Sequence, residues 1–205
     1  MNSFEPVISG GGVASAGARA VDGFGGLTLA TAPGRVMTPR PATEAVVERA
    51  VELAGDAPLR IADVGTGSGA ITVALAARAA HAEIWATDTS AAAVWLARLN
   101  AAWLGVAGRV HILHGDLLEP VPGELDLVLA NLPYLPEAEA ADPDLAGEPP
   151  EAVVAPGDGL GPYRRLLTQC ETRLAPGGIV VIQFRRRVLE ADRNGLGLLR
   201  DRLAA

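Results

Sequence analysis

Three alternating glycines form the stretch of the chain that is best suited to binding a ligand. Gly65, Gly67 and Gly69 follow a short apolar run that contains Asp63, and a helical pattern of apolar residues comes after them. Glycine lets the backbone turn sharply and lets a ligand approach its amides, and the first turn of a helix offers unpaired N–H groups. We therefore expect a strand, a tight turn and a helix, with a flat or anionic ligand against the turn. Such glycines also occur in ordinary strand-to-helix corners, so the motif alone does not decide between the two.

Two aspartates follow later strands of the same expected sheet. Asp88 ends the second strand, where its carboxylate can accept hydrogen bonds from both ribose hydroxyls of a nucleoside. The alternative is that Asp88, or a hydroxyl beside it, caps the next helix. Asp116 follows the third strand, where it can accept from an adenine amine while Leu117 covers the ring. The alternative for Asp116 is an ordinary turn residue, because aspartate is common in turns.

The stretch Asn131-Leu132-Pro133-Tyr134 follows the fourth expected strand and indicates the class of reaction. Ligands of open α/β sheets bind at the carboxyl ends of the strands. There the Asn131 side-chain oxygen and the Leu132 carbonyl can orient the hydrogens of an amine or amide and keep its nitrogen lone pair free, while Tyr134 offers a face for stacking. The alternative is a strand-ending turn stiffened by Pro133, with a core tyrosine. We expect the stretch to position a nitrogen nucleophile.

The glycine spacing and several other segments resemble one family of enzymes. Gly-x-Gly-x-Gly with Asp63 ahead of it resembles the S-adenosylmethionine signature of class I methyltransferases, in which the acidic residue lies near the methionine end of the cofactor. The joint pattern resembles the release-factor glutamine methyltransferases (PrmC, also called HemK) over roughly residues 24–184. The segments that carry the resemblance are residues 35–44, 63–69, 115–120, 131–134, 148–150, 157–160 and 163–165.

This resemblance implies a Rossmann-like class I methyltransferase fold, an S-adenosylmethionine cofactor and methylation of a glutamine side-chain amide in the Gly-Gly-Gln loop of a peptide-release factor. Transfer by direct displacement requires an oriented nucleophile and no strong base. The cofactor residues expected from the resemblance and from the spacing above are Asp63, Gly65, Thr66, Gly67, Ser68, Gly69, Asp88, Asp116, Leu117 and Asn131. The residues expected to orient and bind the substrate are Asn131, Leu132, Pro133 and Tyr134, of which Asn131, Pro133 and Tyr134 are the catalytic candidates.

Three departures from the family pattern leave the substrate open. The family's Asn-Pro-Pro-Tyr is here Asn-Leu-Pro-Tyr, the form typical of ribosomal-RNA adenine dimethyltransferases. We expect no amino-terminal helical domain of the kind with which bacterial members grip the release factor, because a glycine-rich arm stands in its place. After Phe184 the family continues into two more strands, whereas residues 185–205 contain one β-branched residue, Val188, and are expected to be helical.

Four hypotheses about function follow from these observations. The first is methylation of a protein glutamine amide, possibly within a release factor. The second is a small-molecule methyltransferase of specialised metabolism, and the third is a nucleic-acid adenine methyltransferase. The fourth is a degenerate, non-catalytic protein that binds the cofactor or a partner.

Alternating strands and helices must position the residues named above. The spacing predicts an α/β fold with an open, mainly parallel sheet that has helices on both faces. The expected strands are residues 60–64, 83–87, 110–113, 125–130 and 179–184. A small hairpin is expected from residues 27–31 and 35–37. The expected organisation is a flexible arm at 1–26, a methyltransferase domain at 27–184 that is truncated at its C-terminal strands, and a helical tail at 185–205.

The composition argues against several other classes of protein. A chain of 205 residues that is 49% hydrophobic suits one domain with a full core. The net charge of −7 argues against a duplex-binding surface, and one cysteine with three scattered histidines provides no metal site. No run reaches membrane-spanning length and the first residues lack a targeting pattern, so we expect a cytoplasmic protein.

The strand expected at residues 179–184 predicts self-association. If nothing after Phe184 forms a strand, this segment is an apolar sheet edge with unpaired N–H and C=O groups. Soluble proteins cover such edges, and a second copy of the chain would do so. We therefore expect a homodimer or a larger assembly.

Overall fold

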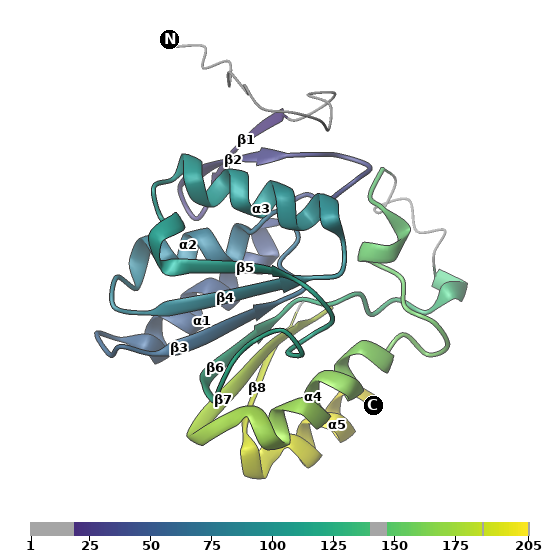
Figure 1. Cartoon of the computed structure of the whole chain (residues 1–205). Coiled ribbons are helices and arrows are strands. Elements are labelled where there is room, and N and C mark those ends of the chain that lie inside the picture. The colour runs from purple at the N-terminus through teal and green to yellow at the C-terminus, as the bar shows by residue number, and fades with distance from the viewer. Residues whose placement is uncertain (1–18, 140–146, 186, 205) are drawn as a thin grey trace.

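A computed structural model of the chain describes residues 19–139, 147–185 and 187–204, with side chains from Gly23 onward. Its centre is a six-stranded sheet with the strand order β5-β4-β3-β6-β7-β8 (Figure 1). Four of the five strand pairings are parallel, and only β8 runs antiparallel to its neighbour. The strands are β3 (Arg60–Val64), β4 (Glu83–Asp88), β5 (Val110–His114), β6 (Leu125–Ala130), β7 (Leu174–Phe184) and β8 (Arg187–Asp192).

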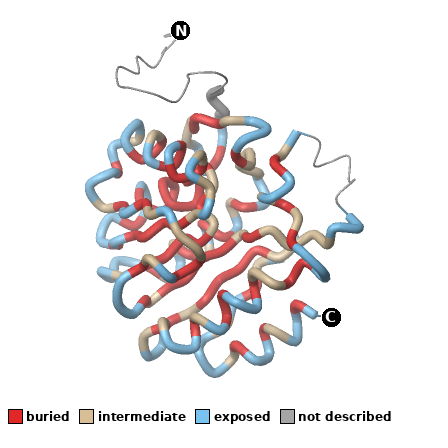
Figure 2. The backbone as a smooth tube through the Cα atoms, turned by 45° about the vertical axis from the view of Figure 1, so that its right-hand side comes forward, coloured by how far each residue is buried: buried red, intermediate tan, exposed pale blue. Residues whose placement is uncertain are grey.

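Helices cover both faces of this sheet. One face carries α1 (Glu44–Ala54), α2 (Ala70–Arg78) and α3 (Ala91–Trp103), and the other carries α4 (Gly161–Arg173) and α5 (Leu196–Ala204) (Figure 1). Leu127 and Leu129 of β6 pack with the first group, whereas Val128 and Ala130 pack with the second. A strand buried on both faces is a continuous apolar run, and Figure 2 shows the central strands buried along their length. The expected fold class is therefore confirmed. None of the described helices is long and apolar enough to cross a membrane.

The hairpin near the start of the described chain differs from the expected one. β2 (Leu27–Thr31) pairs with β1 (Arg19–Phe24), so the expected pairing with residues 35–37 is wrong. Gly25 and Gly26 form the connection with φ values of 56° and 76°, the left-handed geometry that a two-residue hairpin turn requires. The expected flexible arm, residues 1–26, is therefore wrong over residues 19–24, because these residues form a strand. The rest of that arm, residues 1–18, lies outside the described residues.

The C-terminal tail also differs from the expectation. Residues 187–192 form β8, and only the part from Leu196 onward is an α-helix, so a wholly helical tail is wrong. β8 pairs with β7 from Phe184↔Arg187 to Ile179↔Asp192. Pairing to an available apolar edge overrides the weak strand propensity of this segment. Since the chain itself covers the edge of β7, the physical reason for expecting a homodimer is removed.

Candidate functional site

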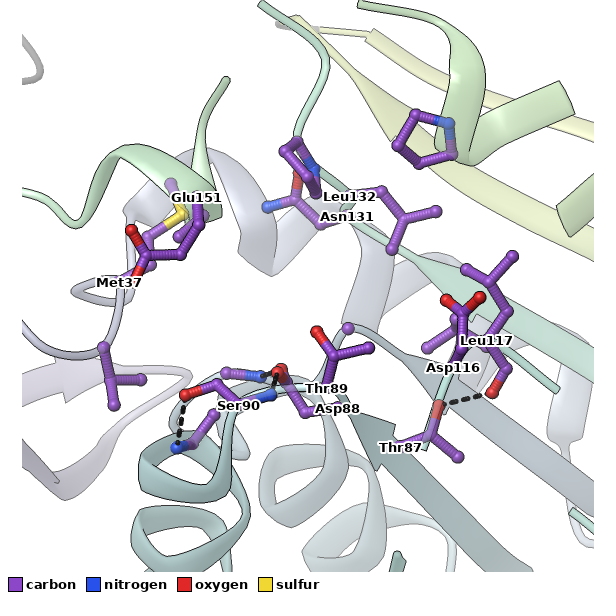
Figure 3. A pocket seen from close by; sticks show the side chains of 18 of the residues that line it. Met37, Thr87, Asp88, Thr89, Ser90, Asp116, Leu117, Asn131, Leu132 and Glu151 are labelled. Carbon is purple, nitrogen blue, oxygen red and sulfur yellow. Dashed lines mark hydrogen bonds between the residues drawn. The ribbon is translucent and has the colours of Figure 1, made fainter. Parts of the chain in front are cut away.

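A cavity of about 220 Å³, called the first cavity here, opens at the carboxyl ends of the central strands. Parallel strands end at one edge of the sheet, so loops that are far apart in sequence meet there. Figure 3 shows the turn after β4 on one side of the cavity and the stretch after β6 on the other. The expected cofactor residues that line the first cavity are Gly65, Gly67, Asp88, Asp116, Leu117 and Asn131.

Asp88 connects the glycine turn to the start of α3. Its Oδ2 accepts from the Gly67 amide at 2.9 Å, and its Oδ1 accepts from the Ser90 amide at 2.8 Å. Burial raises the pKa of the Asp88 carboxyl, while the same backbone hydrogen bonds act in the opposite direction. The residue that caps α3 is Ser90, whose hydroxyl accepts from the Ala93 amide at 3.3 Å. Each carboxylate oxygen of Asp88 retains a lone pair for a donor in the cavity.

Two glycines of the turn serve different purposes. Gly67 has a φ of 56°, and a Cβ built on it would meet nothing within 4 Å, so this residue presents open backbone to the cavity that it lines. Gly69 has a φ of 80°, and a Cβ there would lie 2.9 Å from the Cβ of Ala97 on α3. Gly67 therefore leaves room for a ligand, whereas Gly69 lets α2 and α3 pack closely.

Four expected cofactor residues lie behind the turn and do not line the first cavity, namely Asp63, Thr66, Ser68 and Gly69. The Asp63 carboxylate is completely buried, and its Oδ2 accepts from the hydroxyls of Thr66 at 2.7 Å and Thr72 at 2.6 Å. Burial raises the pKa of this carboxyl, and its Oδ1 has no partner among the described residues. The Ser68 carbonyl accepts from the Asn100 side chain at 2.8 Å. These contacts support the turn, and a direct contact of the four residues with a cofactor stays a prediction.

Asp116 and Leu117 line the same cavity after β5. The Asp116 carboxylate forms an ion pair with the Arg165 guanidinium of α4. Leu117 has a φ of 48°, which is uncommon for a residue with a Cβ, and its carbonyl accepts from the Thr87 hydroxyl at 2.8 Å. A carboxylate and an apolar side chain thus lie near each other along one wall (Figure 3), as the expected adenine contacts require.

A second cavity of about 450 Å³ adjoins the first. It is lined by the 3-10 turn η1 (Pro41–Thr43), by residues 131–135 and by side chains at the end of β7. The two cavities share five lining residues, Met37, Asn131, Leu132, Pro133 and Ala152. They therefore meet at the stretch that follows β6, and a group held in one lies next to a group held in the other.

The side chains of that stretch are held in different ways. The Asn131 Nδ2 donates to the Thr43 hydroxyl at 3.3 Å, which leaves Oδ1 without a partner among the described residues. The Tyr134 ring lines the second cavity and packs edge-on against Phe184, with ring centroids 5.3 Å apart. The amide orientation of Asn131 is thus the one that a nitrogen substrate needs, with the acceptor atom free.

Tyr163 of α4 joins the ends of β6 and β7. Its hydroxyl accepts from the Leu132 amide at 3.0 Å and donates to the Gln183 carbonyl at 2.5 Å. The side chain is fully buried, and burial raises the pKa of the hydroxyl, so it keeps its proton. The Leu132 carbonyl also lies near this hydroxyl, at 3.2 Å. Because the hydroxyl has a single proton, the Leu132 carbonyl retains acceptor capacity for another donor.

We predict that Gly159→Ala displaces the Tyr134 backbone. Gly159 has a φ of 80°, and a Cβ there would lie 2.2 Å from the Tyr134 carbonyl oxygen. The strain is expected to lower the free energy of unfolding by about 2 kcal/mol, measured by urea denaturation. Gly161→Ala is the matched control, because a Cβ at Gly161 meets nothing within 4 Å and its φ is not positive. Equal stability of the two variants would contradict the close approach at Gly159.

Several lining residues were not among the expected site residues. Met37 and Glu151 lie close together on a third side of the first cavity (Figure 3). Thr43 and Gln183 belong to the second cavity. A polar residue at an inward position of the last expected strand was a signal for Gln183, because Ile179 and Val181 before it are apolar. Met37 lies in a loop, and Thr43 and Glu151 lie in short 3-10 turns; the hydrophobic pattern does not predict the path of such connecting segments.

Comparisons with known proteins agree with this geometry. The family model described as the methyltransferase small domain matches residues 41–147, which is more than half of the chain. The release factor glutamine methyltransferases of Gloeobacter violaceus and Moorella thermoacetica are 40% and 43% identical over 153 residues. The matches cover 72% and 73% of this chain and 54% of each relative, so the chain spans about half the length of these proteins.

A solved structure has the same fold. The ribosomal protein L11 methylase of Lactobacillus delbrueckii subsp. bulgaricus matches with a TM-score of 0.55 and 25% identity, over 84% of this chain and 72% of that protein. The resemblance to the release-factor glutamine methyltransferases is thus confirmed at the level of sequence. With its glycine turn and strand-end residues at one edge of a doubly wound sheet, the chain belongs to the methyltransferase small domain family.

Proposed function

We propose that this protein is an S-adenosylmethionine-dependent methyltransferase that acts on the side-chain amide of a glutamine in a protein substrate. One observation carries the proposal. Two cavities share Asn131 in their walls, and the side-chain oxygen of this residue has no partner among the described residues. The first cavity holds the methyl donor, and the second holds the nitrogen that accepts the methyl group.

The residues of the first cavity fit this cofactor. Gly67 leaves open space where a side chain would otherwise stand, Asp88 retains acceptor lone pairs for ribose hydroxyls, and the buried Leu117 offers an apolar surface to a purine. When bound, S-adenosylmethionine supplies an electrophilic methyl group on a sulfonium centre. Asp88 would hold the ribose, and Asp116 and Leu117 would hold the adenine.

The protein's part in the reaction is orientation of the nucleophile. An amide nitrogen becomes more reactive when its hydrogens are held in the plane of acceptors and its lone pair is directed at the methyl group. Asn131 Oδ1 and the Leu132 carbonyl are the acceptors after β6, and the Tyr134 ring provides a face against which a planar amide can stack. Pro133 stiffens the stretch that carries them.

The choice of glutamine rests on the relatives and on charge. The release factor glutamine methyltransferases share about 40% of their residues with this chain over the matched part. The net charge of −7 disfavours a nucleic-acid substrate, for which Asn-Leu-Pro-Tyr would otherwise be suitable. A release factor as the substrate also agrees with the cytoplasmic location that we propose.

We predict that Thr43→Val lowers kcat about fivefold, because the Asn131 amide loses its partner at 3.3 Å and can rotate. One hydrogen bond contributes about 1 kcal/mol, which corresponds to that factor. Thr43→Ser retains the hydroxyl and should restore most of the rate. Kinetics at saturating cofactor measure the effect. Equal rates for the valine and serine variants would show that Thr43 does not orient Asn131.

Incubation with labelled S-adenosylmethionine tests the proposed function. Three sets of acceptors are supplied separately, namely release factors with Gly-Gly-Gln peptides, RNA, and small metabolites. We expect label in the glutamine side chain of the first set. Label in RNA or in a small molecule alone would replace the glutamine assignment with one of the other substrates, and absence of label in all three would reject catalysis.

A further inference from the structure

Gln183 is a buried polar residue at the carboxyl end of β7, and it lines the second cavity. Its side chain lies among apolar neighbours of the strand and is 6% exposed. Ala130 of β6 is in register with Ile182 of β7, so Asn131 and Gln183 each follow a paired residue on adjacent parallel strands. The two amide side chains therefore belong to the same edge of the sheet and to the same cavity.

The side-chain oxygen of Gln183 is left without a hydrogen bond. Its Nε2 donates to the Arg185 carbonyl at 3.5 Å, whereas Oε1 is buried and has no partner among the described residues. The opposite assignment of the amide would place an oxygen next to the Arg185 carbonyl and leave Nε2 unsatisfied, so the assigned orientation is the favourable one. Gln183, a residue of the cavity wall, thus carries a buried acceptor that no described residue satisfies.

The backbone of Gln183 is firmly held. Its carbonyl accepts from the Tyr163 hydroxyl, and the residue pairs with Val188 of β8. A buried acceptor without a partner costs free energy, and an apolar side chain of similar shape would avoid that cost. Because Ile179 and Val181 on the same side of β7 are apolar, the strand accepts apolar side chains there.

We propose that Gln183 is a substrate-binding residue whose Oε1 accepts a hydrogen bond from an N–H of the primary carboxamide in the second cavity. This inference rests on the proposed function and makes it more specific. A primary carboxamide has two N–H groups, and Asn131 and Gln183, which both line the second cavity, each carry a side-chain oxygen without a partner among the described residues. The pair would favour glutamine over glutamate, whose carboxylate has no N–H to donate.

Peptide binding to wild-type protein and to Gln183→Met tests this inference. Calorimetry is carried out on protein saturated with S-adenosylhomocysteine, with two peptides that differ only in having glutamine or glutamate at the acceptor position. We expect the substitution to weaken binding of the glutamine peptide about tenfold and to leave the glutamate peptide nearly unchanged. Cofactor affinity should be unaltered, and the melting temperature should stay the same or rise because an unsatisfied acceptor has been removed.

Gln169→Met is the matched control. The Oε1 of Gln169 on α4 accepts from the Leu118 amide at 2.8 Å, so this oxygen already has a partner. The control variant should lose stability and keep its affinity for both peptides. A melting temperature of Gln183→Met that falls as far as that of the control would indicate a structural role and overturn the inference.

The remaining outcomes separate this inference from the proposed function. An equal loss of affinity for both peptides in Gln183→Met, or no loss of affinity for either peptide, would overturn the role of Gln183. If the wild-type protein binds the glutamine peptide but does not methylate it, the proposed function is rejected. A tenfold loss of affinity for this peptide in Gln183→Met would then still support the binding role. Wild-type protein that binds neither peptide would overturn both.

Discussion

Asn131→Ala is expected to reduce kcat about 100-fold or more while the affinity for S-adenosylmethionine changes little. The substitution removes the side-chain oxygen of a residue that lines both cavities, and it leaves Asp88, Asp116 and Leu117 in place. Loss of orientation at a reacting nitrogen has an effect of this size, because misplacement by about 1 Å can cost about 100-fold in rate. Single-turnover kinetics measure the chemical step, and calorimetry measures cofactor affinity.

Two further variants make this prediction sharper. Asn131→Asp retains an acceptor oxygen but loses the donor to Thr43, so it should fall between wild type and alanine. Thr43→Val removes the same contact from the other side, and its effect should be much smaller than that of Asn131→Ala. A similar loss of rate and of cofactor affinity in Asn131→Ala would place Asn131 in cofactor binding only, and full activity would reject the mechanism.

Asp88→Ala is expected to weaken cofactor binding about 10-fold to 100-fold. Hydrogen bonds to a charged group contribute about 1.5–3 kcal/mol, which corresponds to this range. The Asp88 carboxylate also holds the amides of Gly67 and Ser90, so the alanine variant must be checked by thermal unfolding. Asp88→Asn retains one acceptor oxygen and is the control for loss of charge. Unchanged affinity in both variants would limit Asp88 to holding the turn.

Cofactor binding should also depend on pH through Asp88. Burial raises the pKa of this carboxyl above the ordinary value of 3.8. The ionised form accepts hydrogen bonds from hydroxyls, so affinity is full above the raised pKa and falls as the pH decreases through it. Titration of binding by calorimetry should show this loss at a higher pH than an ordinary aspartate would give, and Asp88→Asn should abolish it. A profile that is the same in Asp88→Asn and wild type would assign the dependence to another group.

The strands of the central sheet, and the residues that meet at the carboxyl ends of these strands, were predictable from the sequence. Both depend on short stretches of neighbouring residues. Apolar runs that end at a glycine, an aspartate or an asparagine predict buried strands and their ends, as at β3, β4 and β6. Parallel strands then bring Gly67, Asp88 and Asn131 to one edge, whatever the details of packing. The first cavity was therefore largely predictable, although Asp63 and Gly69 turned out to support its wall from behind.

The second cavity could not be predicted in this way. Its wall combines η1, the stretch after β6 and the end of β7, and only folding brings these segments together. Thr43 lies in a segment that resembles the family, but nothing in the sequence indicated that its hydroxyl accepts from the Asn131 side chain. The contact of Glu148 was equally hidden in the sequence: its carboxylate accepts from the Thr38 amide at 2.9 Å, which ties the residues before α4 to the segment before α1.

By itself, the sequence determined the doubly wound sheet, the glycine turn and the family, because hydrophobic period, glycine spacing and short polar motifs are properties of neighbouring residues. Only the tertiary structure decided that β8 forms and which hydrogen-bond partners the buried side-chain amides have. Residues 187–192 have weak strand propensity and become β8 only because the edge of β7 offers them hydrogen bonds. The sequence shows Gln183 only as a polar residue in an apolar strand. It does not show that Nε2 donates to the Arg185 carbonyl while Oε1 has no partner among the described residues.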